Sequence, residues 1–259
     1  MTDSQKFTED CKELRRKSPL VHNITNYVAM NLAAESLLAA GASPFMSFCP
    51  EEAADIVAAS DAVAINIGCL DSQVVKAAKI AAAAALSLKK KWVLDPVGAG
   101  YTPLRNKVAA DLTLHYAPTA IRGNASEIIS LSASLGLCDA RPPKGADSTA
   151  ESAEAVKSAE ALSKLSGAVV SISGETDYIV GPDGRVESVP CGSPLMPRVP
   201  GLGCTATALT AAFLAVNDDS FLACLHAMML MGLAGAKAAE GCPGTGSFPA
   251  RFVDVLSNL

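Results

Sequence analysis

Two kinds of apolar segment alternate along the chain. Short, mostly apolar runs end at a polar residue or a glycine, and longer segments with apolar positions at helical spacing lie between them. The short runs predict strands at 20–26, 62–68, 92–95, 120–121 and 168–173. Strands that alternate with helices indicate βαβ units and a mostly parallel sheet, so the pattern predicts an α/β fold.

The longer segments predict helices between these strands. They lie at 3–17, 28–40, from 50 onward, 71–90, 103–115, from 125 onward, 148–165, 204–216 and 219–240, with one more after 246. Local signals support several boundaries, because Gly41 suits the position after a helix, Asp71 suits an N-cap and Pro50 suits a first turn.

Three other segments have turn or loop chemistry. Residues 178–180 and 186–189 flank a Pro-Asp-Gly turn, which is typical of a hairpin. Residues 136–147 are rich in proline, glycine and charge and predict a surface loop, and a capping box at 148–151 begins the next helix. Residues 43–47 form a short apolar segment with no assigned structure.

Composition excludes several classes of function. The 259 residues are half apolar, which is ample for a large core, and a net charge of −5 without a basic patch argues against nucleic-acid binding. The first residues are charged and polar, unlike a signal peptide, and the apolar segments are interrupted or too short to cross a bilayer. The eight cysteines form no Cys-x-x-Cys pair. We therefore expect a cytoplasmic protein with reduced thiols and no membrane association.

A glycine-rich segment at 200–209 carries the strongest local signal. Gly201 and Gly203 precede an alanine-rich run that predicts a buried helix. Unpaired N–H groups and the helix dipole at such an N-terminus favour an anion such as a phosphate. Cys204 falls in the first turn, where the same field is expected to lower the pKa of its thiol. The alternative is a tight turn followed by a core cysteine, since the segment lacks the lysine of a P-loop.

Polar residues follow several of the predicted strands. In an open α/β sheet, ligands bind beyond the carboxyl ends of the strands, and the glycine-rich segment should face the same edge. The residues expected at these ends are Asn26, Gly68, Asp95, Arg122 and Ser173. A cation, a carboxylate and amide or hydroxyl groups are the ingredients of phosphoryl transfer, and Asp95 and Glu127 are candidates to hold Mg2+.

Each of these residues also has a purely structural alternative. Asp95 before a proline suits a turn, Glu127 early in a helix suits a capping box, and Arg122 suits an exposed ion pair. Met46 suits a core position, and His22 suits a hydrogen-bonded strand residue better than a base. The shared location on strand ends is what favours a functional site.

Five motifs carry a family resemblance. They lie, in this order, at 18–26, 41–44, 94–100, 120–127 and 201–204. Together they resemble hydroxyethylthiazole kinase, a thiamine-salvage enzyme of the ribokinase-like superfamily, and the resemblance extends to the 243–248 segment. It implies a ribokinase-like three-layer α/β/α sandwich with a mostly parallel central sheet, formed by residues 1–259 as a single kinase domain.

The resemblance also implies the reaction and its ATP side. ATP would phosphorylate the hydroxyl of 4-methyl-5-(2-hydroxyethyl)thiazole, with Mg2+ as cofactor. Arg122 would contact an ATP phosphate, Ser173 would sit at the ATP position, and Gly203 would belong to the loop that holds phosphate oxygens. Asp95 and Glu127 would serve the magnesium–phosphate region.

The acceptor side follows from the same resemblance. Met46 and Gly201 would line the thiazole pocket, with Asn26 near it. Cys204 would occupy the place of the catalytic base, where related sugar and pyrimidine kinases usually carry aspartate. The family resemblance further implies a homotrimer whose thiazole sites lie at the subunit boundaries.

Three residues depart from the family pattern. Ser173 stands where a threonine is usual and keeps the hydroxyl. Pro200 and Leu202 replace the threonine and the small residue often found around the first glycine. Pro200 removes a donor N–H, and Leu202 is expected to add bulk beside the phosphate path.

Other functions stay open at this point. A sister ribokinase-like kinase for hydroxymethylpyrimidine or pyridoxal would share the fold, and a non-catalytic relative would bind thiazole or nucleotide without turnover. A dinucleotide-binding oxidoreductase is disfavoured because no Gly-x-Gly-x-x-Gly follows the first strand.

Overall fold

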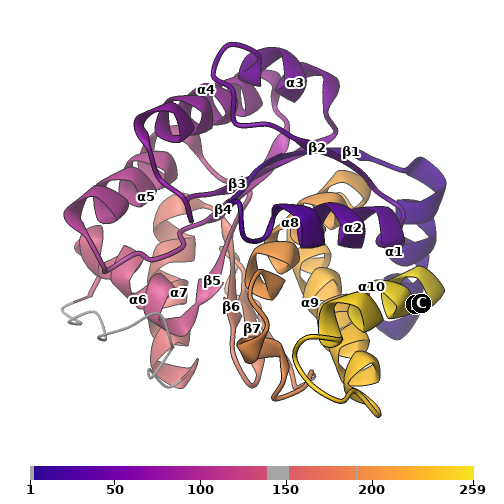
Figure 1. Ribbon diagram of the computed structural model, residues 1–259. Coiled ribbons are helices and arrows are strands. Elements are labelled where there is room, and N and C mark those ends of the chain that lie inside the picture. Colours follow the sequence, from indigo (N-terminus) through magenta and orange to yellow (C-terminus); the bar gives the residue numbers. More distant parts are fainter. Residues whose placement is uncertain (1–2, 139–151, 191) are drawn as a thin grey trace.

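One sheet organises the chain. Within residues 3–138, 152–190 and 192–259, which the computed structural model describes, eight strands form a sheet in the order β2-β1-β3-β4-β5-β6-β7-β8 (Figure 1). Their bounds are β1 Leu20–Ile24, β2 Ser43–Met46, β3 Ala62–Asn66, β4 Lys91–Asp95, β5 Ala120–Asn124, β6 Val169–Ser173, β7 Asp177–Val180 and β8 Val186–Val189. Neighbours from β2 to β6 are parallel, whereas β7 and β8 add as an antiparallel hairpin. The predicted parallel sheet and hairpin are confirmed.

Helices cover both faces of this sheet. Their bounds are α1 Asp3–Lys17, α2 Met30–Ala40, α3 Ala53–Ala59, α4 Ser72–Leu88, α5 Pro103–Tyr116, α6 Ala125–Ser134, α7 Ser152–Ser166, α8 Leu202–Val216, α9 Ser220–Ala239 and α10 Phe248–Asn258. Helices α3 to α7 lie on one face, and α1, α2, α8, α9 and α10 lie on the other (Figure 1). The predicted three-layer arrangement is therefore confirmed.

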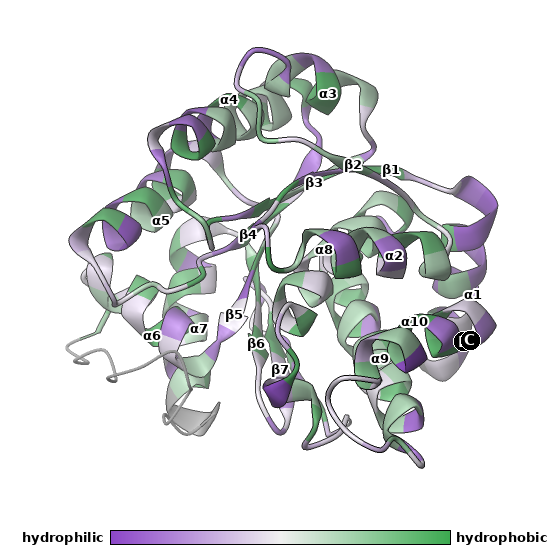
Figure 2. Cartoon of the chain, in the orientation of Figure 1, coloured by the Kyte–Doolittle hydropathy of each residue, from purple (hydrophilic) through white to green (hydrophobic). Residues whose placement is uncertain are grey.

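Two apolar cores result from the alternation of side chains along each strand. In β4, Val93 packs into the core under α8, whereas Trp92 and Leu94 on either side pack into the opposite core. Strands of a parallel sheet covered on both faces are largely apolar. Figure 2 shows hydrophobic stretches in the sheet together with paler and hydrophilic parts, and polar residues such as Arg122 in β5 interrupt the apolar runs. Polar side chains in these strands are therefore exceptions that need a partner.

Local capping chemistry sets most helix boundaries where the sequence predicts them. Gly41 ends α2 with φ +103°, a left-handed conformation that favours glycine. The Asp71 carboxylate accepts hydrogen bonds from the N–H groups of Gln73 and Val74 and so begins α4. The helix expected from Pro50 instead begins at Ala53, after a turn. The predicted capping box at 148–151 and most of the predicted loop lie outside the described residues.

Helix α9 corrects an expectation about membranes. In the part of the chain that the structure describes, it is the one helix long and apolar enough to cross a bilayer, so the expectation that the apolar segments are interrupted or too short is wrong for this helix. However, 72% of its apolar window is buried inside the protein, where it packs against β6, β7 and β8. Its apolar composition is that of a core helix.

Candidate active site

The predicted site residues gather at the carboxyl edge of the parallel strands. Asp95 ends β4, Arg122 lies near the end of β5, Ser173 ends β6, and Asn26 follows β1. Helix α8 packs across β1, β3 and β4, and its first turn carries Cys204 to the same edge. Contacts between these side chains define the site.

Asp95 is the buried carboxylate of this edge. Its Oδ2 accepts hydrogen bonds from Nδ2 of Asn66 at 2.6 Å and from Oγ1 of Thr207 at 2.7 Å. Its Oδ1 is buried without a hydrogen-bond partner among the described residues. Burial raises the pKa of Asp95 to about 7, the charge of Arg122 opposes this rise, and the charge of Glu127 adds to it. Asp95 thus does not serve a turn, and one of its oxygens is left for a ligand.

Arg122 is held inside the protein and is not an exposed ion-pair partner. Its residue is 7% exposed, and Nη2 donates to Oγ of Ser173 at 2.7 Å. A Cβ added to Gly203 would lie 3.0 Å from Nη1 of Arg122, so the absence of a side chain lets the first turn of α8 approach the guanidinium closely. A cation and a helix N-terminus therefore converge, which favours an anion between them.

Glu127 combines two roles in the fold. Its Oε2 accepts from the N–H of Asn124 at 2.9 Å while the Asn124 side chain caps the helix, so the capping box is confirmed. Its Oε1 accepts from the N–H of Gly98 at 3.0 Å and so ties α6 to the loop after β4. The carboxylate also stands close enough to Asp95 to raise the pKa of that group.

Cys204 lies half-buried in the first turn of α8. Nδ2 of Asn26 donates to the sulfur at 3.0 Å and contacts Oδ1 of Asn66 at 3.3 Å, and Asn66 in turn bonds Asp95. Burial, with the negative charge of Asp95 beside it, raises the pKa of the Cys204 thiol to about 11. The prediction of a lowered thiol pKa is therefore wrong, because desolvation of a thiolate outweighs the field of the helix N-terminus.

The residues assigned to the acceptor side come from neighbouring segments. Gly201 has φ +89°, and a Cβ there would lie 3.1 Å from Cα of Ala29, so the loop packs directly on the start of α2. Met46 ends the edge strand β2 and is half-buried, packed against the core. His22 is fully buried with Nε2 2.9 Å from the carbonyl oxygen of Ser47, which confirms a structural role.

Leu202 corrects another expectation. Its side chain is 3% exposed and belongs to the core that contains α2, α8 and α9. The expectation of added bulk beside the phosphate path is therefore not supported, because the side chain is packed in this core. Pro200, one residue before the glycine, is exposed.

The donor set at this edge fits a magnesium ion. Among the described residues, no group of three or more His, Cys, Asp or Glu side chains could enclose a metal. Mg2+ usually takes one or two protein carboxylates and completes its shell with water and phosphate oxygens. The unpartnered, buried Oδ1 of Asp95 provides one such oxygen beside Glu127.

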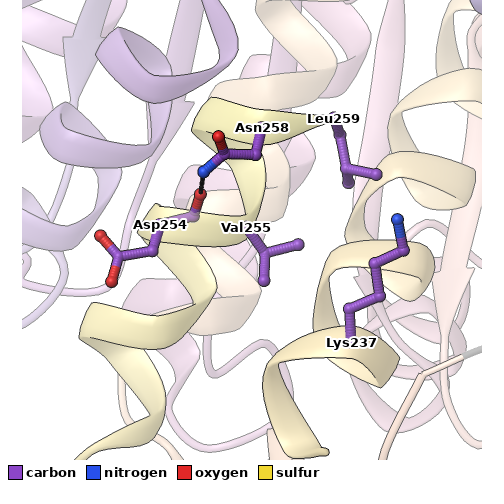
Figure 3. Close-up of a pocket in the computed structure, with 5 residues that line it drawn as sticks. All are labelled: Lys237, Asp254, Val255, Asn258 and Leu259. Carbon is purple, nitrogen blue, oxygen red and sulfur yellow. Dashed lines mark hydrogen bonds between the residues drawn. The ribbon is translucent and has the colours of Figure 1, made fainter.

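A separate cavity of about 210 Å³ lies between α9 and the C-terminal end of α10, in the same helix layer as α8. Figure 3 shows its lining side chains from α9 and α10, namely Lys237, Asp254, Val255, Asn258 and Leu259. Asn258 donates to the backbone oxygen of Asp254 at 2.7 Å, a contact within α10. None of the residues predicted for the site lines this cavity.

Four residues of this region were not predicted as part of the site. They are Asn66, Arg105, Asp177 and Thr207. Asn66 ends β3, so the rule that selected the other strand ends identifies it. Thr207 lies within an apolar helix, where no sequence signal separates it from the core. Burial raises the pKa of Asp177 to about 6, against the hydrogen bond from Gly174 and the charge of Arg122.

Comparison with solved structures defines the class of protein. The fold is ribokinase-like: a ribokinase-like superfamily protein from Enterococcus faecalis V583 has a TM-score of 0.65 at 14% identity, covering 94% of this chain and 89% of its own. A hydroxyethylthiazole kinase protein from Pyrococcus horikoshii OT3 has a TM-score of 0.89 at 36% identity, with 98% and 94% of the two chains covered.

Sequence comparison narrows the class to one family. The model of the hydroxyethylthiazole kinase family matches residues 11–259. A hydroxyethylthiazole kinase from Syntrophus aciditrophicus (strain SB) is 46% identical over 248 residues, which cover 96% of this chain and 90% of the relative. The chain belongs to the hydroxyethylthiazole kinase family.

Proposed function

We propose that this protein transfers the γ-phosphoryl group of ATP to the hydroxyl of 4-methyl-5-(2-hydroxyethyl)thiazole, a reaction of thiamine salvage. The observation that carries the proposal is the convergence of Arg122, Asp95 and the first turn of α8 at one sheet edge. Such a site suits a reaction that depends on positioning and on stabilising charge at phosphate oxygens. Membership of the hydroxyethylthiazole kinase family supports the choice of acceptor.

The ATP side of the site acts through charge. Arg122, fixed by its hydrogen bond to Ser173, offsets the negative charge of the phosphates. The first turn of α8 approaches this guanidinium at Gly203, so its N–H groups and Arg122 hold the same phosphoryl oxygens. Ser173 contributes its hydroxyl at the nucleotide and, by accepting the hydrogen bond from Arg122, holds the guanidinium in place.

Magnesium has a defined place in this proposal. Asp95 would hold Mg2+ through its unpartnered Oδ1, with Glu127 next to it. The ion would neutralise charge on the phosphates of ATP. With the cation present, Asp95 stays ionised, because a nearby positive charge favours the carboxylate.

The acceptor side depends on Cys204. Asn26 donates to the sulfur, which orients the side chain and stabilises negative charge on it. A thiol with a pKa of about 11 is largely protonated at neutral pH, so it orients the substrate hydroxyl and does not remove the proton before attack. The loose transition state of phosphoryl transfer requires little help from a base. Met46 and Gly201 would line the thiazole pocket.

The assembly and location complete the proposal. A homotrimer with the thiazole site at subunit boundaries is supported by exposed apolar side chains beside the site, Tyr27 at 61% and Val28 at 69% exposure. We place the reaction in the cytoplasm, where cysteines stay reduced, and the seven described cysteines are free.

A substrate panel tests the proposal. Purified protein is incubated with ATP and the thiazole, hydroxymethylpyrimidine or pyridoxal alcohol, with and without Mg2+, and ADP and phosphorylated product are measured. The thiazole alcohol should give the highest kcat/KM, and omission of Mg2+ should abolish turnover. Preference for another alcohol assigns a sister activity, whereas binding without turnover on every alcohol assigns a non-catalytic role.

A further inference from the structure

Thr207 differs from the other threonines of α8. The hydroxyls of Thr205 and Thr210 donate to the carbonyl oxygens of Gly201 and Ala206, four residues earlier in the same helix. Thr207, which is 1% exposed, instead donates to Oδ2 of Asp95 at 2.7 Å, across 112 residues of sequence. Its hydroxyl therefore links the helix to the sheet edge.

This bond makes the two oxygens of Asp95 unequal. Oδ2 accepts from both Asn66 and Thr207, whereas Oδ1 is buried and unpartnered among the described residues. Burial of a carboxylate oxygen without a hydrogen-bond donor costs free energy unless a bound ligand interacts with that oxygen. Two donors on one oxygen fix the rotation of the carboxylate and so determine where the other oxygen points.

The position of Thr207 also relates Asp95 to the thiol. Residues three apart on a helix lie on the same face, so Cys204 and Thr207 face the sheet edge together. A second connection runs from the sulfur through Asn26 and Asn66 to Asp95. The same helix, α8, therefore carries the thiol of Cys204 and donates a hydrogen bond to the carboxylate of Asp95.

We propose that Thr207 is a positioning residue that orients Asp95, so that Oδ1 is presented to the magnesium–phosphate group at a fixed separation from Cys204. The proposal deepens the proposed function and rests on it for the identity of the phosphate ligand. Partners that orient a metal-binding carboxylate affect metal affinity although they do not touch the metal.

The test compares Thr207→Val with Thr207→Ser and Thr210→Val. Valine keeps the volume of threonine and removes the hydroxyl, and serine keeps the hydroxyl. Thr210→Val makes the same chemical change one turn later in the helix, where only a bond within α8 is lost. Binding of a non-hydrolysable ATP analogue is measured by calorimetry over a range of Mg2+ concentrations, together with kcat, KM and the melting temperature.

The proposal predicts a selective effect of Thr207→Val. The Mg2+ concentration for half-maximal analogue binding should rise about tenfold or more, with a matching loss of kcat/KM. Analogue affinity without Mg2+ should stay unchanged. Thr207→Ser should remain close to the parent protein. Thr210→Val should lower the melting temperature about as much as Thr207→Val does, but it should change the Mg2+ concentration for half-maximal binding by less than about twofold.

Other outcomes overturn the proposal. Unchanged Mg2+ dependence in Thr207→Val shows that Asp95 is oriented without the hydroxyl, and equal losses in Thr207→Val and Thr210→Val show general disturbance of α8. If Thr207→Val does not fold, Thr207→Ala is compared with Thr210→Ala by the same criteria. A parent protein that binds Mg2+ and the analogue but phosphorylates no alcohol contradicts the proposed function, while the Mg2+ dependence still decides the role of Thr207.

Discussion

Cys204 is the residue whose chemistry the structure changes most. The helix N-terminus alone predicts a reactive thiolate, yet burial beside Asp95 raises the pKa of the thiol to about 11. The sulfur therefore contributes mainly by orienting the acceptor hydroxyl and by accepting the hydrogen bond from Asn26.

Cys204→Ala should accordingly slow the reaction without abolishing it. We expect a loss of kcat of about 10- to 100-fold, at or below the lower limit of about 100-fold for a general acid or base, whereas Arg122→Met should lose about 10³-fold. Cys204→Asp should remain active, because aspartate is the usual residue at this place in related kinases. Steady-state kinetics of the three variants decide this, and equal losses for Cys204→Ala and Arg122→Met contradict it.

The raised pKa of Asp95 predicts that the stability of the metal-free protein depends on pH. Its pKa of about 7 in the folded state exceeds its ordinary value of 3.8, so the folded state holds the proton more tightly than the unfolded state. This contribution to stability is complete below about pH 4 and is lost as pH rises through about 7. Asp95→Asn removes the charge and keeps an oxygen that accepts from Asn66 and Thr207.

Asp95→Asn should therefore be inactive. Its stability relative to that of the parent protein should be greater at about pH 8 than at about pH 5. Thermal unfolding of both proteins in EDTA across this range measures the difference in melting temperature. A difference that does not change with pH would mean that the carboxylate is not appreciably desolvated.

Some site residues can be read from the sequence and others cannot. Asp95, Arg122 and Ser173 follow predicted strands, and the topology of parallel sheets brings such positions together. Thr207 was missed because the period of an apolar helix does not reveal which neighbour a buried hydroxyl meets. The thiol pKa was mispredicted because the degree of burial depends on contacts distant in sequence.

At the scale of elements, Arg105 of α5 joins two loops of the site edge. Nη1 donates to the carbonyl oxygens of Ile67 and Val97, both at 2.7 Å, and Nη2 donates to that of Gly68 at 2.8 Å. Residue 68 follows β3 near Asn66, and Val97 precedes Gly98, which bonds Glu127. The guanidinium therefore fixes the loops that support both halves of the site.

Arg105→Met should lower both stability and activity. We expect a loss of kcat/KM of about tenfold, because a small displacement of the two loops moves Glu127 and Asn66. Arg251→Met is the matched control, since Arg251 also bonds backbone carbonyl oxygens, those of Ala238 and Glu240, far along the chain from the site. Melting temperatures and kinetics are compared, and parallel kinetic losses in both variants contradict a specific role for Arg105.

Element boundaries were predicted well where caps act locally. Asp71 and Gly41 define helix ends through their own backbone contacts, so the sequence is sufficient there. The segment 43–47 is too short to show a period, and only its pairing with β1 makes it the strand β2. The start of α3 at Ala53 likewise depends on the turn that follows β2.

At the scale of the whole molecule, exposed apolar side chains gather near the acceptor side. Tyr27, 61% exposed, and Val28, 69% exposed, adjoin Asn26, and the ring of Tyr27 contacts that of Phe48, two residues after Met46. Exposed apolar residues beside a polar site are typical of a surface that another chain covers. They support the proposed trimer, in which this surface would meet a second copy.

Val28→Asp should therefore shift the protein toward monomer and raise KM for the thiazole alcohol by about tenfold or more, with KM for ATP less affected. Leu165→Asp, at a 48% exposed position on α7, is the control and should change neither property. Sedimentation velocity and steady-state kinetics provide the measurements. A monomeric Val28→Asp variant with unchanged KM would remove the subunit boundary from the acceptor site.

Phosphoryl transfer to the thiazole alcohol is measured most directly by 31P NMR of the protein incubated with Mg2+-ATP and that alcohol. The proposed kinase activity requires one phosphomonoester on the hydroxyethyl group per ADP formed, and loss of that signal when Mg2+ is withheld or Asp95 is replaced by Asn. Absence of the phosphomonoester from folded protein that binds both substrates would contradict it.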